Sequence, residues 1–521
     1  MKTLTSYVCG TWHEAGAGFR ELVNPSTEEV LARASSDGVD FAAVLDHARN
    51  AGGPALRAMT FGERGGLLKA MSKAIREHRD ELLELSARNN GTTAGDGSFD
   101  VDGASGTLAY YAALSKGIGD RRVLVEGDGV QLAKTEGFWA QHVLVPRQGV
   151  AVHINAFNFP AWGFAEKAAQ ALLAGMPVIT KPATATCLVT HRMVEILVAA
   201  EILPEGALQL ICGGTGDLLD RLGPQDVLAF TGSADTALRL RKNERLMAAS
   251  TRFNVEADSL NAAVLGPGVG ADSETLGLFL RDVRREVTQK AGQKCTAVRR
   301  VLVSREQIDA VTDALVGKLG KTAPGDPLEE GVRMGPLATA DQLADAERGV
   351  AELEAGGARR VLGDGKRVDG VGAPEGKGYF WAPTVLRVDD GHAADVVHQR
   401  EVFAPVVTLV PYDGTAADAA ALVALAEGTL VTSVYSDDDA WLADFLAEAG
   451  CHTGRLYVGS TDSAEAAFGS GAALPQALHG GPGRAGGGQE LGGIVGLRLY
   501  LQRLALQGSR GKVEGLAGIG E

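Results

Sequence analysis

Val150-Ala151-Val152-His153-Ile154 is a short, mainly apolar stretch that opens a repeating pattern. Further stretches of this kind follow at residues 178–181, 208–211, 227–231 and 253–256. Helical patterns separate them, near residues 164–174, 186–200, 216–222 and 234–248. Short strands that alternate with helices pack into a mainly parallel sheet with helices on both faces. The pattern therefore predicts an α/β fold with a doubly wound, Rossmann-type sheet.

Polar and small residues stand where the expected strands end. They are Asn158, Lys181, Gly213, Gly214, Gly232, Ser233 and Glu256. Ligands of open α/β sheets bind beyond the carboxyl ends of the strands. These positions therefore predict a nucleotide site, although no GxGxxG fingerprint follows any of the strands.

A second α/β unit is expected between residues 271 and 463. A long amphipathic helix precedes Cys295, and a strand at 299–303 and a helix at 306–319 follow it. Later strands are expected near 406–410 and 431–435. Ahead of both units, the first 91 residues predict a small strand pair and three helices. The helices are expected at 40–50, from the capping box Thr60 to Glu63 onward, and at 79–89.

Length and composition limit the class of protein. With 521 residues, 45% hydrophobic and 22% charged, the chain is long enough for two or three domains with large cores. A net charge of −15 argues against a general nucleic-acid or anionic-membrane surface. Five widely spaced cysteines without a CxxC pair predict a reducing compartment, no disulfide and no metal site. No signal-peptide or membrane-spanning pattern is present, so we expect a cytoplasmic protein.

Ala291-Gly292-Gln293-Lys294-Cys295-Thr296-Ala297 places one thiol among small, polar and charged neighbours. Cys187 and Cys212 lie in apolar runs and are expected to be core residues. Gly292 allows a ligand to approach the backbone closely, and Lys294 and nearby N–H groups are candidates to stabilise a thiolate. A lone cysteine is more often an inert thiol, so the hypothesis of a nucleophile depends on partner groups.

Covalent catalysis at a carbonyl also needs donors for an oxyanion and a base that releases the acyl group. Asn158, in the turn Phe157-Asn158-Phe159-Pro160, offers an amide donor. Glu256, in Asn254-Val255-Glu256-Ala257-Asp258, offers a carboxylate after an apolar stretch. An isolated glutamate in such a place is more often a solvated charge or a member of an ion pair. Its order with Asn158 and Cys295 favours a catalytic role.

These segments, in this order, resemble the aldehyde dehydrogenase superfamily. Further motifs that carry the resemblance are Ile179-Thr180-Lys181-Pro182-Ala183, Phe230-Thr231-Gly232-Ser233 and Glu401-Val402-Phe403-Ala404-Pro405-Val406. The resemblance runs from about Tyr7 to Tyr500, and several ordered motifs are far more specific than one. It implies a Rossmann-type cofactor domain, an α/β catalytic domain and a β-hairpin oligomerisation element.

The resemblance also implies a mechanism. The Cys295 thiolate would add to the aldehyde carbon, while the Asn158 amide and the Cys295 N–H hold the oxyanion. Hydride would pass to the nicotinamide, and Glu256 would activate the water that releases the thioester as a carboxylate. The chain departs from the usual pattern because Ala257-Asp258-Ser259 replaces the Leu-Gly-Gly after the glutamate, and Phe157 replaces a tryptophan before the asparagine.

Cofactor contacts are carried over from the same motifs. Glu401 would bond the nicotinamide ribose, Phe403 would pack against the ring or ribose, and Lys181 would reach the adenosine ribose. The other expected cofactor-binding residues are Phe157, Thr184, Gly213, Gly232 and Ser233. Thr184 stands where NAD-preferring relatives often have a glutamate, and a neutral side chain beside a lysine removes the repulsion that a 2′-phosphate would meet. We expect NADP, with use of both NADP and NAD as the alternative.

The expected domains are a cofactor-binding domain of residues 1–122 and 146–257 and a catalytic domain of residues 258–465. Residues 123–145 alternate as in an exposed hairpin. In the resembled family such a hairpin pairs across a subunit interface with a segment near the C-terminus, here expected at 495–504. The segments 123–145 and 480–510 are therefore expected to build a homodimer.

Residues 478–487, Leu-His-Gly-Gly-Pro-Gly-Arg-Ala-Gly-Gly, replace the family's Pro-Phe-Gly-Gly-x-Lys. By composition alone they are a flexible linker. As a motif they resemble the branch that oxidises CoA-linked semialdehydes in aerobic benzoate and phenylacetate degradation, which implies a small CoA-linked aldehyde as substrate. The alternatives are a general aliphatic aldehyde dehydrogenase, an enzyme for the oxepin-CoA-derived semialdehyde of phenylacetate degradation, a CoA-acylating enzyme and a non-catalytic binding protein. Glu256 argues against the CoA-acylating enzyme and Cys295 against the binding protein.

Overall fold

The alternating segment builds a seven-stranded sheet in the computed structural model, which describes residues 1–519. The sheet order is β12-β11-β8-β9-β10-β2-β3. Its five parallel strands are β8 (Ala151–Ile154), β9 (Val178–Lys181), β10 (Leu208–Leu210), β11 (Val227–Thr231) and β12 (Arg252–Glu256). At one edge, β2 (Ser6–Val8) and β3 (Thr11–His13) add antiparallel strands. The predicted doubly wound sheet is confirmed, and the strand order reverses between β8 and β11.

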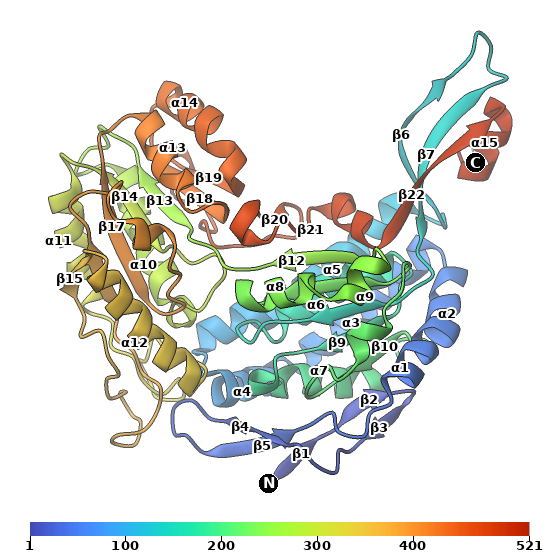
Figure 1. Ribbon diagram of the computed structural model, residues 1–521, viewed down its shortest axis with the longest axis horizontal. Helices are drawn as coiled ribbons and strands as arrows, with labels where there is room; N and C mark the ends of the chain where they lie inside the picture. Colours follow the sequence, from blue (N-terminus) through green and yellow to red (C-terminus); the bar gives the residue numbers. More distant parts are fainter. Residues whose placement is uncertain (520–521) are drawn as a thin grey trace.

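Helices cover both faces of this sheet (Figure 1). They include α6 (Trp162–Leu173), α7 (Leu188–Ala199), α8 (Ala234–Arg241) and α9 (Glu244–Ala248). The single helix expected at 234–248 is divided because Asn243 caps the start of α9, with its side chain accepting from the Leu246 N–H. The stretch expected at 216–222 forms only a short 3-10 turn, Leu218–Arg221.

The N-terminal region contains one long helix that the sequence did not predict. The expected helices are present as α1 (Phe41–His47), α3 (Phe61–Glu77) and α4 (Arg79–Asn90), together with a shorter α2 (Gly53–Ala58). The unpredicted helix, α5 (Ala94–Ile118), is rich in glycine and aspartate. Its Gly103 lets it pack closely on α6, because a Cβ there would lie 2.8 Å from the Trp162 ring.

A second seven-stranded sheet, of order β15-β16-β17-β14-β13-β18-β19, forms the other large unit, on the left of Figure 1. Its strands are β13 (Ala262–Leu265), β14 (Arg300–Ser304), β15 (Arg359–Leu362), β16 (Thr384–Arg387), β17 (Val406–Tyr412), β18 (Thr429–Tyr435) and β19 (Thr453–Gly459). The helices are α10 (Glu274–Thr288), α11 (Ile308–Leu319), α12 (Ala340–Ala355), α13 (Ala416–Ala424) and α14 (Asp439–Ala449). The two sheets have separate hydrophobic cores. The chain passes from the first unit to the second in the segment between β12 and β13.

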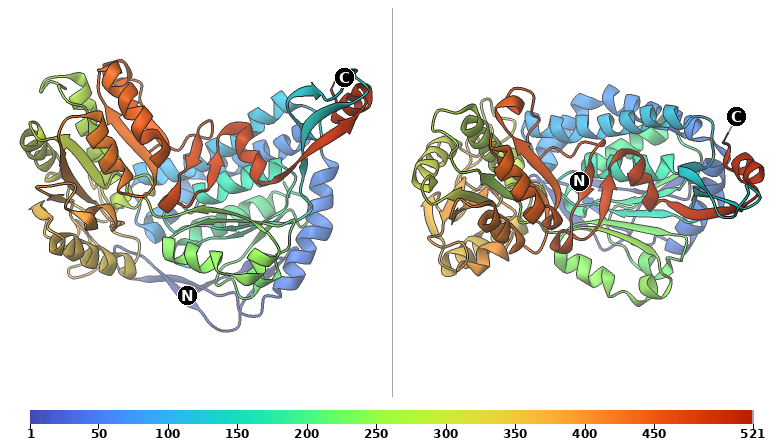
Figure 2. Two further views of the ribbon diagram at one scale, coloured as in Figure 1. Left: turned by 45° about the horizontal axis from the view of Figure 1, so that its top comes forward. Right: turned by 90° about the horizontal axis from the view of Figure 1, so that it is seen from above.

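A small sheet projects from the first unit (Figures 1 and 2). It consists of β6 (Leu124–Gln131), β7 (Trp139–Pro146) and β22 (Leu501–Gly508), followed by α15 (Arg510–Ala517). The expected pairing of the hairpin with the C-terminal segment is corrected in two respects. It occurs within one chain, and it begins at Leu501, because residues 493–499 form a 3-10 helix. Another small sheet lies near the N-terminus and consists of β1 (Lys2–Leu4), β5 (Val30–Ala34) and β4 (Arg20–Val23).

The glycine-rich segment is ordered instead of acting as a linker. It forms a hairpin of β20 (Leu478–Gly480) and β21 (Gln489–Leu491) beside β12. Gly486 and Gly488 lie against the Val255 carbonyl, where a Cβ on either would be 2.3 Å from the oxygen. The glycines therefore allow close backbone packing next to the end of β12. Separately, none of the helices in residues 1–519 is both long and apolar enough to cross a membrane.

Candidate active site

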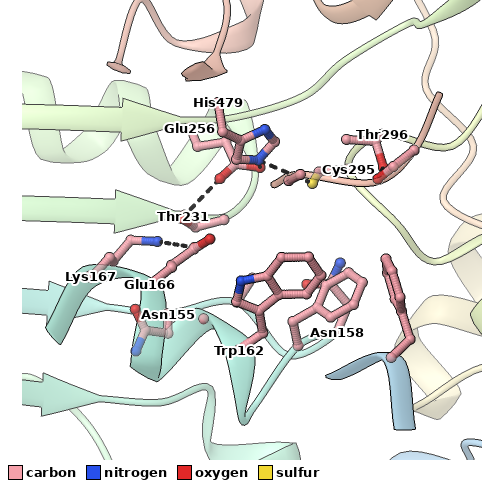
Figure 3. A pocket seen from close by; sticks show the side chains of 16 residues that line it. Asn155, Asn158, Trp162, Glu166, Lys167, Thr231, Glu256, Cys295, Thr296 and His479 are labelled. Atoms are coloured by element: carbon pink, nitrogen blue, oxygen red, sulfur yellow. Dashed lines mark hydrogen bonds and ion pairs between the residues drawn. The ribbon is translucent and has the colours of Figure 1, made fainter. Parts of the chain in front are cut away.

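Two cavities meet at Cys295, in the region between the two large units. Figure 3 shows the side chains that line the smaller one. The larger has a volume of about 990 Å³ and the smaller about 40 Å³. The residues that line both are Asn155, Ala156, Asn158, Thr231, Glu256 and Cys295. The structure therefore brings the three expected catalytic side chains together at the junction of the cavities.

The loop before Cys295 has an unusual backbone that fixes the thiol. Lys290, Ala291 and Gly292 all have positive φ, at 53°, 51° and 69°. A Cβ on Gly292 would lie 2.3 Å from the Ala404 carbonyl oxygen, so only glycine fits there. The Asn261 side chain donates to the Cys295 carbonyl at 2.8 Å. Sequence reasoning missed Asn261, which supports the loop from outside the motif.

The expected role of Lys294 is wrong. Its Nζ lies 2.6 Å from a Glu286 carboxylate oxygen and donates to Gln289 at 2.8 Å. Lys294 is therefore held by side chains of the preceding helix, because an ammonium group that is 1% exposed needs a buried anion to pair with. It belongs to the support of the loop and does not stabilise a thiolate.

Asn158 is buried in the wall shared by the cavities. Its Nδ2 donates to the Gln293 carbonyl at 3.0 Å, which places the amide beside the backbone that leads to Cys295. The Asn158 Nδ2 carries two N–H bonds, and only one donates to Gln293, so the other is available as a donor to an oxyanion formed beside Cys295.

Glu256 is the last residue of β12 and faces His479 on β20. The Glu256 Oε1 lies 3.2 Å from the His479 Nε2, and both side chains are 4% exposed. Burial alone would raise the pKa of Glu256, but His479 and, more weakly, Lys167 lower it to about 2. The carboxylate therefore stays ionised at neutral pH. Sequence reasoning missed His479, although its place in the altered glycine-rich motif was the available signal.

A charged cluster lies behind Glu256. The Lys167 Nζ is 2.8 Å from Glu166 and 3.1 Å from Glu490, and carboxylate oxygens of Glu166, Glu256 and Glu490 lie within 4.8 Å of one another. Burial raises the pKa of Glu490 to about 7, although Lys167 opposes the shift. Glu490 can therefore bind or release a proton near neutral pH.

The larger cavity contains most of the expected cofactor-binding residues. Those that line it are Phe157, Lys181, Gly232, Ser233, Glu401 and Phe403. The Phe157 and Phe403 rings pack edge to face, with centroids 5.8 Å apart. Thr184 and Gly213 are not among the lining residues. The Thr184 hydroxyl donates to the Gly213 carbonyl at 3.3 Å, and Gly213 packs against the backbone of Ser36.

Glu401 is hydrogen-bonded to the unusual triplet Ala257-Asp258-Ser259 that follows Glu256. The Arg299 guanidinium lies 3.3 Å from Glu401, and the Ser259 N–H donates to the same carboxylate at 3.3 Å. Burial raises the pKa of Glu401 to about 7, while Arg299 opposes the shift. Asp258 accepts from the Ala234 N–H at 3.0 Å, at the start of α8. The unusual residues therefore bind their surroundings and do not disturb Glu256.

Three aromatic rings line one side of the smaller cavity. Phe99, Phe159 and Trp162 pack edge to face on one another, with centroids 5.2 to 5.9 Å apart. The cavity is narrow and mainly apolar, and it reaches Cys295 from the side of Gly471.

The two cavities and the thiol, amide and carboxylate at their junction are the arrangement expected of an enzyme that acts on a carbonyl compound. The chain belongs to the aldehyde dehydrogenase family, which matches residues 12–503. It is 47% identical over 481 residues to 3,4-dehydroadipyl-CoA semialdehyde dehydrogenase from Aromatoleum evansii, covering 92% of this chain and 93% of that protein. It is 27% identical to the NADP(+) succinate-semialdehyde dehydrogenase of Escherichia coli strain K12, covering 77% of this chain and 78% of that protein.

A solved structure shows the same fold. Betaine aldehyde dehydrogenase from Staphylococcus aureus, in complex with NAD+, superposes with a TM-score of 0.82 at 24% identity. The match covers 98% of this chain and 98% of that chain. The predicted family and its fold are confirmed.

Proposed function

We propose that the protein oxidises a CoA-linked semialdehyde, 3,4-dehydroadipyl-CoA semialdehyde, to the carboxylate with NADP as hydride acceptor. The observation that carries the reaction class is the meeting of two cavities at Cys295, with Glu256 and Asn158 in the shared wall. The substrate rests on the relative that is 47% identical.

In the first half of the reaction, Cys295 sulfur attacks the aldehyde carbon. The carbonyl oxygen gains negative charge, and the Asn158 amide and the Cys295 N–H are the donors that stabilise it. Donors fixed in a buried wall need no reorganisation when the charge appears. NADP would supply the hydride acceptor when bound, and Glu401 and Phe403, which line the larger cavity together with Cys295, would hold its nicotinamide end.

In the second half, Glu256 acts as general base on water. Its ionised carboxylate takes a proton as the water oxygen attacks the thioester carbon, and the carboxylate product leaves Cys295. The proton then has a route away from the site, because Lys167, Glu166 and Glu490 lie directly behind Glu256. Glu490, with a pKa of about 7, is the group in this cluster best suited to pass a proton on.

We further propose NADP over NAD, with use of both as the alternative. Lys181 lines the cofactor cavity and offers a positive charge to a 2′-phosphate. Thr184 lies outside the lining but is neutral, so the segment after Lys181 adds no carboxylate beside it. We also propose a homodimer, which the projecting hairpin supports, and a cytoplasmic location, which fits five free cysteines.

The test is reduced-cofactor formation by the purified protein. NADP and NAD are offered separately, with the CoA-linked semialdehyde and with a medium-chain aliphatic aldehyde. We expect NADPH from both aldehydes, with a kcat/KM at least tenfold higher for the CoA-linked one. Cys295→Ala should lose turnover by roughly 10³-fold or more, and the exposed-cysteine control Cys451→Ala should keep it.

The other functions predict different results. Equal kcat/KM for the two aldehydes would favour a general aliphatic aldehyde dehydrogenase. Preference for the oxepin-CoA-derived semialdehyde would place the protein in phenylacetate degradation. An acyl-CoA product that needs free CoA would indicate a CoA-acylating enzyme. Absence of turnover with every aldehyde, or full activity of Cys295→Ala, would contradict the proposed mechanism.

A further inference from the structure

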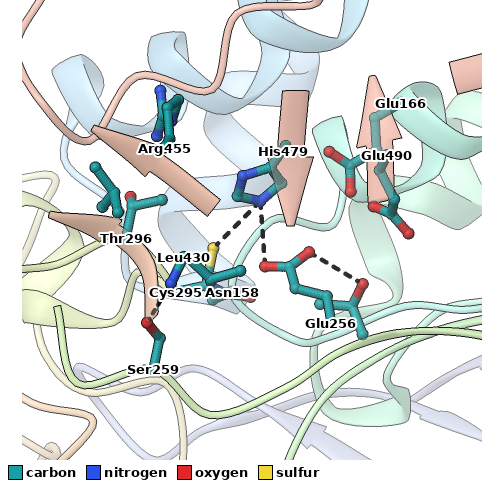
Figure 4. Close-up of polar contacts among 12 residues, drawn as sticks. Asn158, Glu166, Glu256, Ser259, Cys295, Thr296, Leu430, Arg455, His479 and Glu490 are labelled. Atoms are coloured by element: carbon teal, nitrogen blue, oxygen red, sulfur yellow. Dashed lines mark hydrogen bonds and ion pairs between the residues drawn. The ribbon is translucent and has the colours of Figure 1, made fainter. Parts of the chain in front are cut away.

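His479 lies between the thiol and the general base of the proposed reaction. Its Nε2 is 3.9 Å from the Cys295 Sγ and 3.2 Å from the Glu256 Oε1. Figure 4 shows the imidazole reaching toward both side chains from β20. A carboxylate oxygen of Glu256, the sulfur of Cys295 and a ring nitrogen of His479 all lie within 4.8 Å of one another. A single nitrogen of His479 can therefore interact with both the sulfur and the carboxylate.

The surroundings of Cys295 oppose its ionisation. Burial raises the pKa of the Cys295 thiol well above its usual value, and the Glu256 carboxylate raises it further. Lys294, the nearest cation in the sequence, pairs with Glu286 instead.

Two guanidinium groups, those of Arg299 and of Arg455 on β19, face Cys295. Burial lowers the pKa of both, and both lie close enough to the sulfur for its thiolate to oppose that shift. Their hydrogen bonds go elsewhere, since Arg299 donates to Glu401 and Arg455 to the Ala472 carbonyl, so neither takes the thiol proton. A nucleophilic sulfur therefore requires a group that takes the proton and leaves a positive charge beside it.

His479 has the charge environment of such a group. Burial opposes its protonation, but the Glu256 carboxylate outweighs burial and raises the pKa of His479. Glu166, on α6, acts in the same direction, whereas Arg455 acts against it, and Glu490, on β21, also faces this cluster. The second ring nitrogen, Nδ1, is buried and has no hydrogen-bond partner within residues 1–519. The contacts of Nε2 with Cys295 and Glu256 are therefore the hydrogen-bonding contacts of this imidazole in the described residues.

We propose that His479 is a catalytic base that takes the proton of the Cys295 thiol before the sulfur attacks the aldehyde. The S–H bond breaks, its electron pair stays on sulfur, and an N–H bond forms at Nε2. The imidazolium then lies against the Glu256 carboxylate, which stabilises the positive charge without being protonated. Glu256 thus remains an anion for the hydrolysis step. The inference rests on the proposed function, because it requires Cys295 to be the nucleophile.

The sequence offers matched replacements for the test. The usual family motif has phenylalanine at the position of His479, and phenylalanine cannot accept a proton. His479→Phe therefore restores the usual side chain and removes the base. His479→Gln keeps a polar side chain of similar length, but its amide nitrogen is not basic. If His479 has a purely structural role, one of the two variants should keep the reactivity of Cys295 better than the other. If His479 is a base, both variants should lose that reactivity.

The experiment measures the thiol itself, without aldehyde or cofactor. The full-length protein and both variants are alkylated with iodoacetamide across a range of pH, and modification of the Cys295 peptide is followed by mass spectrometry. We expect the apparent pKa of Cys295 to rise by at least one unit in both variants. One unit corresponds to a tenfold smaller thiolate fraction, so alkylation near neutral pH should slow about tenfold or more. The exposed Cys451 in the same samples is the internal control and should react equally.

The outcomes separate this inference from the proposed function. An unchanged pH profile in both variants, or a loss in His479→Phe that His479→Gln restores, would overturn the role of His479 as a base. Turnover of the wild type that vanishes in Cys295→Ala would still support the proposed function in either case. A wild type without aldehyde turnover, but with His479-dependent alkylation, would overturn the proposed function and leave the thiol–imidazole pair in place.

Discussion

Glu256 is placed to act in the second half of the proposed reaction, so its removal should separate the two halves. We expect Glu256→Gln to retain a burst of NADPH of about one equivalent per site, because hydride transfer precedes hydrolysis. The burst should be slower than in the wild type, because the carboxylate that stabilises the His479 imidazolium is missing. Steady-state turnover should fall roughly 10²- to 10⁴-fold, the usual contribution of a general base. Rapid-mixing absorbance and mass spectrometry of the acylated Cys295 peptide measure both effects. Glu375→Gln, on an exposed loop, is the control and should match the wild type. Loss of both burst and turnover would contradict the assignment.

Glu401 gives a pH prediction for cofactor binding. Burial raises the pKa of Glu401 to about 7, so the side chain is mainly protonated at pH 6 and mainly ionised at pH 8. Hydrogen bonds to a carboxylate exceed those to a neutral carboxyl by about 1 kcal/mol. The dissociation constant of NADP should therefore fall several-fold as pH rises from 6 to 8. Fluorescence titration without aldehyde tests this, and Glu401→Gln should remove the slope. A slope that survives in Glu401→Gln would assign the titration to another group.

At the level of single residues, the sequence allowed prediction of the site residues that lie in recognisable motifs. Asn158, Glu256 and Cys295 could be selected because each stands in a recognisable segment. His479 and Asn261 could not be assigned in advance, because their effect depends on a distance across the fold and not on their neighbours in sequence. Lys294 shows the opposite error, since closeness in the chain suggested a contact that the Glu286 carboxylate prevents.

The loop that carries Cys295 depends on the backbone of Gly292. A Cβ at Gly292 would meet the Ala404 carbonyl at 2.3 Å, and the positive φ adds strain to any other residue. Gly292→Ala should therefore displace Cys295 and reduce kcat/KM about 100-fold, the size expected for a misplacement of about 1 Å. Gly277→Ala, inside α10 with nothing within 4 Å of its Cβ, is the matched control and should retain activity. Similar activity of both variants would contradict the importance of this backbone.

Elements were predictable where periodicity and end signals agree. β9 and β11 match their expected bounds because each is a short apolar run with a clear stop. The helix after Thr60 was also expected, since the capping box forms as the sequence indicates. α5 was missed because its glycines lower helix propensity while serving close contact with α6. Tertiary packing thus overrides local preference at α5.

At the scale of the whole molecule, the sequence predicted the projecting sheet of β6, β7 and β22 only in part. The alternating pattern at 123–145 predicted the hairpin, but its pairing with the C-terminal strand lies within one chain. This intrachain contact places β7 in the middle of the projecting sheet, so β6 and β22 form its two edges in the part of the chain that the structure describes. The partner was expected at residues 495–504 of a second subunit, whereas it is Leu501–Gly508 of the same chain. Long-range partners of a strand are not encoded in its own residues, so the sequence could not distinguish the two arrangements.

The β6 edge of this sheet should determine the oligomeric state. Within residues 1–519, β6 has unpaired backbone groups along its free edge. Val130 in this strand and Phe138 in the same hairpin are 54% and 45% exposed. An exposed strand edge with apolar side chains favours pairing with a second copy of the chain. We expect sedimentation equilibrium to give about twice the 54.1 kDa mass of one chain. Phe138→Glu should weaken the dimer at least tenfold, because it places a charge in an apolar contact. Met247→Glu, on α9 and 65% exposed, is the control and should leave the mass unchanged. A monomeric wild type, or equal effects of the two substitutions, would contradict this role of the hairpin.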